Sequence, residues 1–331
     1  MWRGIGVVFE DKGVVSLEEY EIGSLEPGRL LVKTFYTLIS PGTETAFLLG
    51  LPNTPSVYPQ YPGYSNVGVV EDLAEDVELF KVGDIVVSPS RHASIVNPKA
   101  ENTFKIPEGL DPIEAVFFYL SAIALQGVRK SEPEIGESAV VLGLGLIGQL
   151  AAQFLALSGA TPIIGVDLYD YRVKVTESLS IDYGLNPLKI DVASEVYRVT
   201  DGRGASIVIE STGNPEAVNL AFKLAGRRGR VVLLGSTRGL STVNFYSDVH
   251  RKGLIIIGAH NSIRPRTESS RWFWNLRDDV EVVFKLLSKK RLKVRELISS
   301  ILDYRSAGEA YRLLIDSKDR VISIALDWRR G

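Results

Sequence analysis

The chain has 331 residues, of which 45% are hydrophobic and 24% charged. This balance is typical of a soluble globular protein with one large or two ordinary domains. The formal net charge of −2 excludes a general attraction to nucleic acid or to anionic membranes. The absence of cysteine excludes disulfides, thiol catalysis and cysteine-ligated zinc.

Two further features concern the surroundings in which the protein works. No apolar run reaches the roughly 18 residues of a membrane helix, and the N-terminus is too strand-like for a signal peptide. We therefore expect a cytoplasmic protein. A single methionine and no cysteine also suit a thermophile, in which labile residues are depleted.

The first 110 residues alternate short β-type runs with turns that contain Pro or Gly. The predicted strands are 4–9, 13–17, 29–40, 67–72 and 84–88. Short strands at close spacing predict a β-barrel-like domain. After them, Asp111 is an expected N-cap with Pro112 at the first helical position, and the apolar run 115–125 predicts a buried helix that leads into a second domain.

From residue 138 onward, strands alternate with helices. The predicted strands are 139–142, 163–166, 182–184, 207–210, 230–234 and 254–257. A helix at 215–224, with Asn214 as its N-cap, is one of the helices between them. Repeated βα units predict a doubly wound parallel sheet. A helix at 279–289 follows, and the tail adds a helix at 306–315 and a strand at 321–325.

The first βα unit carries a dinucleotide-binding fingerprint. The apolar strand 138–142 runs into Gly143, Gly145 and Gly148, and a buried helix follows. Gly143 permits the tight turn, and Gly145 lets the backbone approach a pyrophosphate. Gly148 lets the helix pack close to the strand. Strand, glycine turn and helix in this order are the context that the fingerprint requires.

Several other residues are expected to contact the same cofactor. Leu146 and Ile147 begin the helix, whose N–H groups and dipole favour phosphates. Asp167 ends the second strand about 20 residues later, where a carboxylate binds the ribose hydroxyls and favours NAD over NADP. Arg172 is either a neighbour of the adenosine ribose or a solvated helix residue. Loops at other strand ends supply Thr212, Gly213, Gly235, Ser236 and Gly258, although ordinary turn glycines would look the same.

Six short motifs occur along the chain, at 61–63, 67–70, 80–87, 143–148, 200–204 and 229–235. Together they resemble the medium-chain dehydrogenase/reductase family. The resemblance implies an α/β protein with a GroES-like β-barrel catalytic domain at 1–125, completed by 290–331, and a Rossmann NAD-binding domain at 126–289. It also implies hydride transfer between the domains, a homodimer or homotetramer, and a pyrophosphate contact from Arg320 in the tail.

The positions that bind catalytic zinc in many members of this family hold other residues here. They are Ser40 or Pro41, then Tyr64 and Ser65, and then Tyr119 or Leu120. The cysteine-rich structural lobe of the zinc members is missing as well. We therefore predict no metal. The variants at 40–44 and 62–65 resemble a zinc-free branch that includes bacteriochlorophyllide-dehydrogenase-like proteins.

A site without zinc needs hydrogen-bond donors, or a general acid, at the substrate oxygen. Tyr64, which stands where the family has a histidine ligand, is the first candidate, with aromatic packing as its alternative. Thr43 aligns with the hydroxyl that relays protons in the family, or caps a turn. Ser40 is a further candidate, and Glu44 is expected to hold its loop together.

Two histidines are candidate substrate contacts. His260 follows the last predicted strand of the doubly wound sheet and could face the nicotinamide. His92 opens a strand whose family counterpart lies near the pocket. Either could instead be structural.

These features predict a zinc-independent, NAD-dependent oxidoreductase that acts on an alcohol or carbonyl group of a small molecule, with no nucleic-acid or membrane partner. One alternative is an NAD(P)H quinone or enoyl reductase, which Asp167 disfavours because such enzymes usually prefer NADPH. The other alternative is a catalytically idle nucleotide-binding protein, which the loss of every metal ligand would allow.

Overall fold

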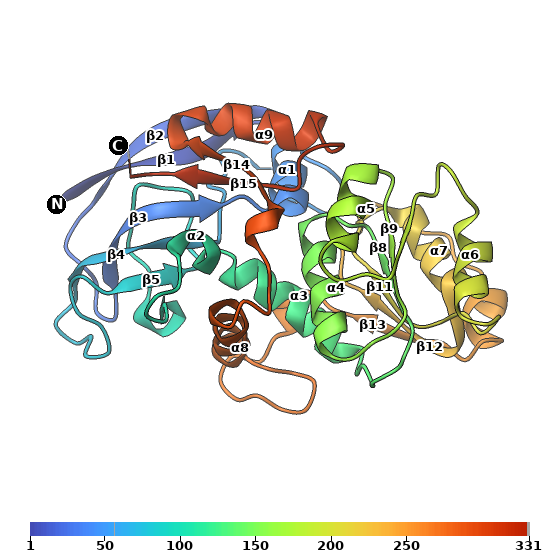
Figure 1. Ribbon diagram of the computed structural model, residues 1–331. Helices are drawn as coiled ribbons and strands as arrows, with labels where there is room; N and C mark the ends of the chain where they lie inside the picture. Colours follow the sequence, from blue (N-terminus) through green and yellow to red (C-terminus); the bar gives the residue numbers. More distant parts are fainter. Residues whose placement is uncertain (56, 330–331) are drawn as a thin grey trace. The chain divides into compact units, whose positions relative to one another are not determined.

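The computed structural model describes residues 1–55 and 57–329 (Figure 1). The chain divides into two compact units, Met1–Leu120 with Val280–Gly331, and Ser121–Asp279. The chain therefore leaves the first unit, builds the whole of the second, and returns to complete the first. Among the described residues, no helix combines the length and the apolar character that crossing a membrane requires.

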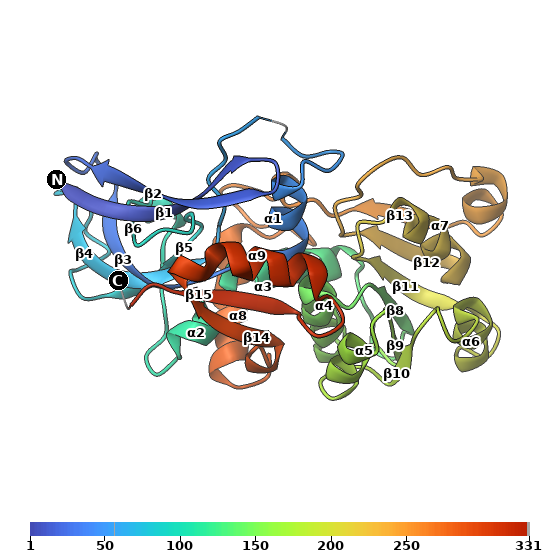
Figure 2. The same cartoon turned by 90° about the horizontal axis from the view of Figure 1, so that it is seen from above.

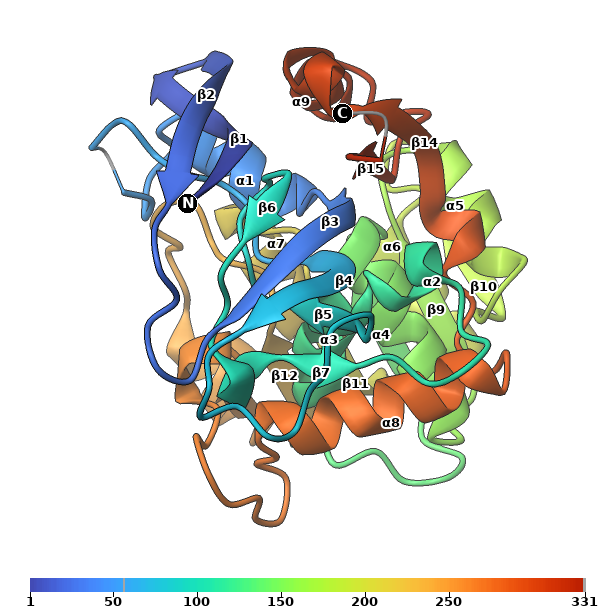
Figure 3. The same cartoon turned by 90° about the vertical axis from the view of Figure 1, so that its left-hand side faces the viewer.

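The first unit contains a two-stranded ribbon and a seven-stranded sheet. The ribbon pairs β1 (Trp2–Asp11) with β2 (Val14–Ile22) in antiparallel register. The sheet has the order β14-β15-β3-β4-β5-β7, with β6 paired to β3, and β3, β4 and β5 lie side by side in Figure 3. Its strands are β3 (Leu30–Leu38), β4 (Asn66–Leu73), β5 (Ile85–Ser88), β6 (Ile95–Val96), β7 (Phe104–Lys105), β14 (Ile298–Asp303) and β15 (Ser323–Asp327).

Helices pack on this sheet, and one of them was not predicted. They are α1 (Pro41–Leu48), α2 (Pro112–Ala115) and α9 (Ala307–Asp316). Figure 2 shows α9 beside α1 and β15. The predicted strand 29–40 is too long at its end, because β3 ends at Leu38 and α1 follows. Pro41 suits the first helical position, and the Glu44 carboxylate accepts the N–H of Ser40 at 2.8 Å, a contact similar to the return half of a capping box.

The second unit holds a six-stranded parallel sheet of order β10-β9-β8-β11-β12-β13. Counted from β8, this is the order 3-2-1-4-5-6 of a dinucleotide-binding doubly wound sheet, so the predicted parallel α/β sheet is confirmed. Its strands are β8 (Ala139–Leu142), β9 (Ile163–Val166), β10 (Tyr183–Leu185), β11 (Ala205–Glu210), β12 (Ala225–Leu233) and β13 (Ile255–Gly258).

The helices of the second unit alternate with these strands. They are α4 (Leu146–Leu157), α5 (Asp170–Glu177), α6 (Val192–Val199) and α7 (Pro215–Leu224), while α3 (Phe118–Lys130) and α8 (Leu276–Ser288) cross the unit boundaries. Short 3-10 turns lie at Ala100–Asn102, Asn261–Ile263, Arg295–Leu297 and Tyr304–Ser306, and a π-helical turn at Phe245–His250. Asn214 caps α7 as predicted, because its side chain accepts the N–H of Glu216.

Each unit has its own hydrophobic core. In the second unit, Val140, Ile164 and Val208 are fully buried at the centre of the parallel sheet. In the first unit, the core between β1, β15 and α9 combines aliphatic and aromatic side chains, and Phe9 meets Tyr311 edge to face with ring centroids 5.0 Å apart. Burying large apolar side chains is the main source of stability in such layers.

Candidate active site

The glycine turn in the second unit has the backbone geometry that a dinucleotide needs. Gly143 follows β8 with a φ of 85°, a conformation that favours glycine. A Cβ atom on Gly148 would lie 1.8 Å from the carbonyl oxygen of Gly143, so α4 packs against the turn only if this residue is glycine. Gly145 is the N-cap of α4, and the N–H groups of Leu146 and Ile147 begin the helix behind it. A phosphate therefore fits this helix N-terminus.

Asp167 lies at the end of β9, beside the glycine turn. One carboxylate oxygen accepts the N–H of Leu144 at 2.7 Å, and the other accepts the N–H of Tyr169 at 2.9 Å. Arg172 lies next to it, with Nη1 3.9 Å from the same carboxylate. A Cβ built on Gly145 would meet only Arg172, at 3.8 Å. Asp167 and Arg172 thus flank the open face of the turn, and these groups fit the adenosine end of a dinucleotide.

The loops after β8, β11 and β12 meet at the carboxyl edge of the sheet. A Cβ on Gly143 would lie 2.7 Å from the side chain of Thr212, and one on Gly213 would lie 2.8 Å from the carbonyl of Ser236. The space around Gly235 is equally small, since a Cβ added there would lie 2.7 Å from the Gly213 nitrogen. Gly258 ends β13 and has open space around it.

Sequence reasoning missed Glu210, the last residue of β11. Its side chain accepts the N–H of Thr212 at 2.7 Å and a hydrogen bond from the Thr212 hydroxyl. Burial raises the pKa of this carboxyl group. Glu210 therefore orients Thr212 in the loop. The available signal was an acidic residue at the end of an apolar strand.

Two residues that were expected to contact substrate or cofactor, His260 and Arg320, make hydrogen bonds with residues close to them in the sequence. His260 is exposed on the second unit, where Nδ1 accepts the N–H of Ser262 at 3.2 Å and lies 2.7 Å from its hydroxyl. Arg320 is exposed in the tail and donates to the Ser317 hydroxyl at 3.2 Å. Their roles at substrate and pyrophosphate therefore stay predictions.

In the first unit, the structure brings together three candidates for substrate chemistry. The side chains of Ser40 and Thr43 lie near the Tyr64 hydroxyl, and Thr43 and Tyr64 line the same cavity. Its ring contacts Tyr119 with a centroid separation of 5.4 Å. Tyr64 and Tyr119, which occupy two of the positions assigned to zinc ligands, thus form an aromatic pair. Burial, and then the charge of Glu44, raise the pKa of Tyr64 well above its usual value, so its phenol stays protonated near neutrality.

Glu44 is the centre of a buried network next to Tyr64. Its side chain accepts the N–H of Ser40, lies 2.8 Å from Nε2 of His92, and accepts the Tyr311 hydroxyl. Glu44, His92 and Tyr311 are almost completely buried. Glu44 therefore does more than hold its own loop, because it joins α1, the segment before β6 and α9.

His92 is placed differently from the expected substrate contact. It is fully buried, and its Nε2 is engaged by Glu44. A Cβ on Gly63 would lie 2.5 Å from the His92 nitrogen, so the backbone closes over it. Within the described residues, Nδ1 of His92 has no hydrogen-bond partner. His92 is an interior group of the network and not a lining residue of the cavity beside it.

That cavity encloses about 310 Å³ and lies beside Tyr64. Its lining is mainly aromatic, proline and glycine, with few polar groups. The lining residues are Phe9, Thr43, Glu44, Phe47, Pro55, Gln60, Tyr61, Pro62, Gly63 and Tyr64. Predominantly apolar walls with a few convergent polar groups are typical of small-molecule sites.

The residues at the expected zinc positions do not fit that metal. Tyr64, Tyr119 and Ser65 offer only hydroxyl groups, and the Ser65 hydroxyl already donates to the carbonyl of Val116 at 2.5 Å. Zinc prefers His, Cys and carboxylate ligands. In residues 1–55 and 57–329, no group of three or more His, Cys, Asp or Glu side chains is placed to hold a metal ion.

The family model and two relatives that match this chain are all described as dehydrogenases. The family described as zinc-binding dehydrogenase matches residues 147–272. A D-guloside 3-dehydrogenase of Escherichia coli (strain K12) is 27% identical over 254 residues, which cover 76% of this chain and 72% of that protein. An L-threonine 3-dehydrogenase of Pyrococcus horikoshii is 28% identical over 275 residues, which cover 73% and 78%. The chain is therefore similar to zinc-type, alcohol dehydrogenase-like members of the medium-chain dehydrogenases/reductases.

Solved structures show the same fold. A galactitol-1-phosphate dehydrogenase from Escherichia coli superposes with a TM-score of 0.85 at 19% identity, over 98% of this chain and 99% of that one. Similar structures contain NADH in one case and NADP in another. The likeness to these structures concerns the fold, and the named dehydrogenase relatives indicate an oxidoreductase. The family match begins at residue 147, so it does not include the positions of the zinc ligands.

Proposed function

We propose that this protein is a zinc-independent, NAD-dependent oxidoreductase that interconverts an alcohol and a carbonyl group of a small molecule. In this proposal the first unit is the GroES-like catalytic domain and the second is the Rossmann domain. The observation that carries it is the position of Tyr64, whose phenol lines a cavity and stands where the family has a zinc ligand. The named dehydrogenase relatives support the alcohol class.

The chemistry follows from the hydroxyl groups around Tyr64. When bound, the nicotinamide supplies or accepts the hydride. In the direction of carbonyl reduction, the Tyr64 hydroxyl hydrogen-bonds the substrate oxygen and transfers its proton to that oxygen. Burial and Glu44 disfavour the phenolate that remains, and the nearby Ser40 and Thr43 side chains offset part of that cost because they favour the charged form. Proton transfer and charge stabilisation at oxygen thus replace the Lewis acid of the zinc enzymes.

Asp167 predicts the choice of cofactor. We expect NADH to bind about tenfold or more tightly than NADPH, because a carboxylate next to a 2′-phosphate is a like-charge contact. Fluorescence titration of the protein with each reduced cofactor measures both affinities. In Asp167→Asn the two affinities should approach each other. Asp170→Asn is the matched control, since Asp170 is exposed and pairs with Lys189. Tighter NADPH in the native protein would favour the quinone or enoyl reductase alternative.

Because the residues at the expected zinc positions offer only hydroxyl groups, we predict that the active protein contains no stoichiometric zinc. Elemental analysis of protein purified without a histidine tag should give well under one zinc per chain, and chelator treatment should leave turnover unchanged. Zinc near one equivalent whose removal abolishes turnover would overturn zinc independence, even if NADH binding were retained.

We further propose a homo-oligomer that assembles through the second unit. β13 is an edge strand of the sheet, and Ile255 and Ile256 are 54% and 38% exposed on it. An exposed apolar edge strand is a template for pairing with another strand, and a second copy of this chain offers the same edge. Analytical ultracentrifugation should show a dimer or tetramer, and Ile256→Lys should shift it to monomer. A monomeric native protein at micromolar concentration would contradict the proposal.

A further inference from the structure

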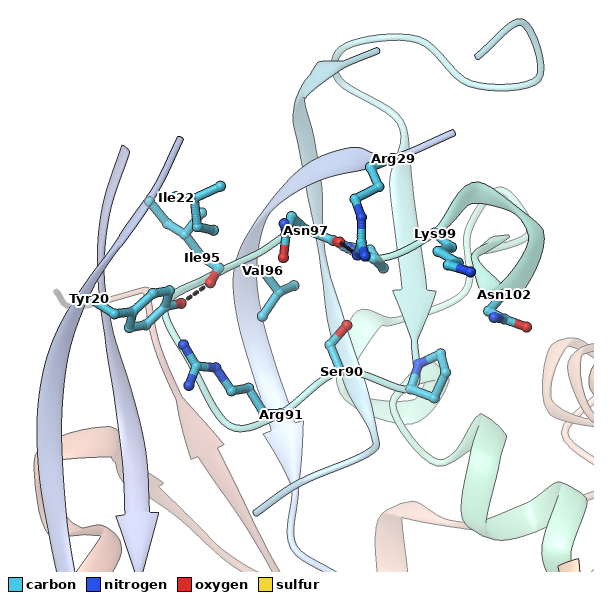
Figure 4. A pocket seen from close by; sticks show the side chains of 12 residues that line it. Tyr20, Ile22, Arg29, Ser90, Arg91, Ile95, Val96, Asn97, Lys99 and Asn102 are labelled. Carbon is cyan, nitrogen blue, oxygen red and sulfur yellow. Dashed lines mark hydrogen bonds between the residues drawn. The ribbon is translucent and has the colours of Figure 1, made fainter. Parts of the chain in front are cut away.

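A second cavity lies in the first unit, and Tyr64 is not among its lining residues. It also encloses about 310 Å³ and is formed by residues of β2, by Arg29 just before β3, and by residues between 89 and 102 (Figure 4). Its polar lining is cationic: Arg29, Arg91 and Lys99 contribute positive charge, while Ser90 and Asn97 contribute neutral polar groups. None of the lining residues is acidic.

Arg91 is held in place by aromatic rings. The guanidinium carbon lies 3.9 Å from the ring centroid of Tyr20 and 5.2 Å from that of Tyr61. Burial raises the pKa of the Tyr20 phenol, which donates to the carbonyl of Ile95. The described residues include no carboxylate within ion-pair distance of Arg91. Stacking occupies the faces of a guanidinium and leaves its N–H edge available to an acceptor.

The other two cations differ in how tightly they are held. Arg29 is fixed, since Nε pairs with Glu26 at 2.8 Å and Nη1 donates to the carbonyl of Asn97 at 2.8 Å. Lys99 is 59% exposed and lies 3.7 Å from Glu101, a weak surface pair. Two carboxylates therefore lie near the cavity but outside its lining, against three cations that line it. The balance inside the cavity is positive.

We propose that this cavity binds the oxyanion group of a small organic molecule, a phosphate monoester or a carboxylate, with Arg91 as its main anchor. A guanidinium presents paired donors that match both oxyanions. The Ser90 hydroxyl and the Asn97 amide offer further donors at the same cavity (Figure 4). The site is adjacent to the candidate substrate pocket, because Tyr61 lines that pocket and also stacks on Arg91. The inference does not depend on the proposed oxidoreductase activity.

Calorimetric titration of the NADH-saturated protein tests the site, since bound NADH blocks anions from the glycine turn. The anions are inorganic phosphate, glycerol 3-phosphate and succinate. We expect saturable binding of one anion per chain. Stronger binding of the two phosphates would identify a phosphate monoester as the ligand class, and stronger binding of succinate would identify a carboxylate.

Variants locate the binding at Arg91. Arg91→Gln should weaken it by about tenfold or more, the size expected for a charged hydrogen bond, and Arg91→Lys should restore part of the loss. Arg305→Gln is the matched control and should bind as the native protein does, because Arg305 also stacks on a tyrosine but pairs with Asp303.

Three results would overturn the site. They are no saturable binding of any of the anions, equal affinity in Arg91→Gln, and an equal loss in Arg305→Gln. NADH affinity and melting temperature report whether Arg91→Gln is folded. If it is not, the exposed Lys99→Gln carries the test, with an expected weakening of about threefold and an unchanged affinity as the contrary result.

Discussion

Replacing Tyr64 by Phe should lower the turnover number for carbonyl reduction by about 10²- to 10⁴-fold, the usual contribution of a positioned proton donor. The ring and its contact with Tyr119 would remain, so the cavity should keep its shape and NADH its affinity. Only the hydroxyl, which lies near the Ser40 and Thr43 side chains, is removed. Steady-state kinetics on a panel of alcohols and carbonyl compounds, together with an NADH titration, measure the two effects separately.

Tyr58→Phe is the control for this prediction. The Tyr58 hydroxyl donates to the carbonyl of Phe47 at 2.9 Å and does not line the cavity, so its removal should leave turnover nearly unchanged. If Tyr64→Phe kept full turnover, the Tyr64 mechanism would be wrong. If neither the native protein nor any variant turned over a substrate while NADH bound, the idle-protein alternative would be favoured.

The raised pKa of Tyr64 also predicts a pH profile. A phenol is a proton donor below its pKa, and burial and Glu44 raise that pKa above the ordinary value near 10. The donor form is therefore complete across neutral pH, and carbonyl reduction should show no loss from Tyr64 up to about pH 10. A phenolate base of lowered pKa would instead make alcohol oxidation rise through neutral pH.

The parts of the fold that the sequence predicts well are those set by local patterns. β9 and α7 have the predicted boundaries, because an apolar run that ends at Asp167 and an Asn-Pro start define them locally. The short strand predicted at 182–184 is β10 (Tyr183–Leu185), displaced by one residue. Parallel strands that are buried on both faces give continuous apolar runs. The strands of the second unit are therefore easier to predict from the sequence than those of the first.

The first unit is harder to predict because its pairings join distant segments. β14 is partly exposed along its length, so its sequence lacks a clear alternation, and it was not predicted. α1 is short, and its start depends on the contact between Glu44 and Ser40. The residue pattern of 29–40 cannot predict that contact, because Glu44 lies beyond this range.

The candidate site was predicted in part for the same reason. Ser40, Thr43 and Tyr64 were found through the family resemblance, and the structure brings them together. Tyr311 was not predicted, because it lies 267 residues from Glu44 in the sequence. Its place in α9 is that of an ordinary buried aromatic residue. The buried contact of His92 with Glu44 was likewise invisible, since a lone histidine is compatible with an interior and a pocket position.

The Glu44 network leads to the second large effect, which is on stability. Glu44→Gln would place an amide NH₂ group against two groups, His92 and Tyr311, that offer donors to the native carboxylate. Breaking a buried charged network by changing one member costs about 3 kcal/mol or more. For a unit of this size the melting temperature of the first unit should fall by roughly 5–10 °C. Differential scanning calorimetry measures this change.

A double-mutant cycle shows whether the loss arises in the network. Tyr311→Phe alone should cost about 1 kcal/mol, the net contribution of one hydrogen bond. Combined with Glu44→Gln it should cost less than the sum, because one of the two unpaired donors has already been removed. Glu309→Gln, an exposed residue of the same helix as Tyr311, is the control and should melt like the native protein.

The same experiment connects stability with the proposed chemistry. α1 carries both Glu44 and Thr43, and Thr43 lines the same cavity as Tyr64. A Glu44→Gln variant with a lowered melting temperature but normal NADH affinity would place the defect in the first unit. Its turnover should then also fall, because α1 would be less well ordered. Equal melting of Glu44→Gln and Glu309→Gln would instead show that the carboxylate contributes no more than an exposed one, and that Tyr64 is positioned without the network.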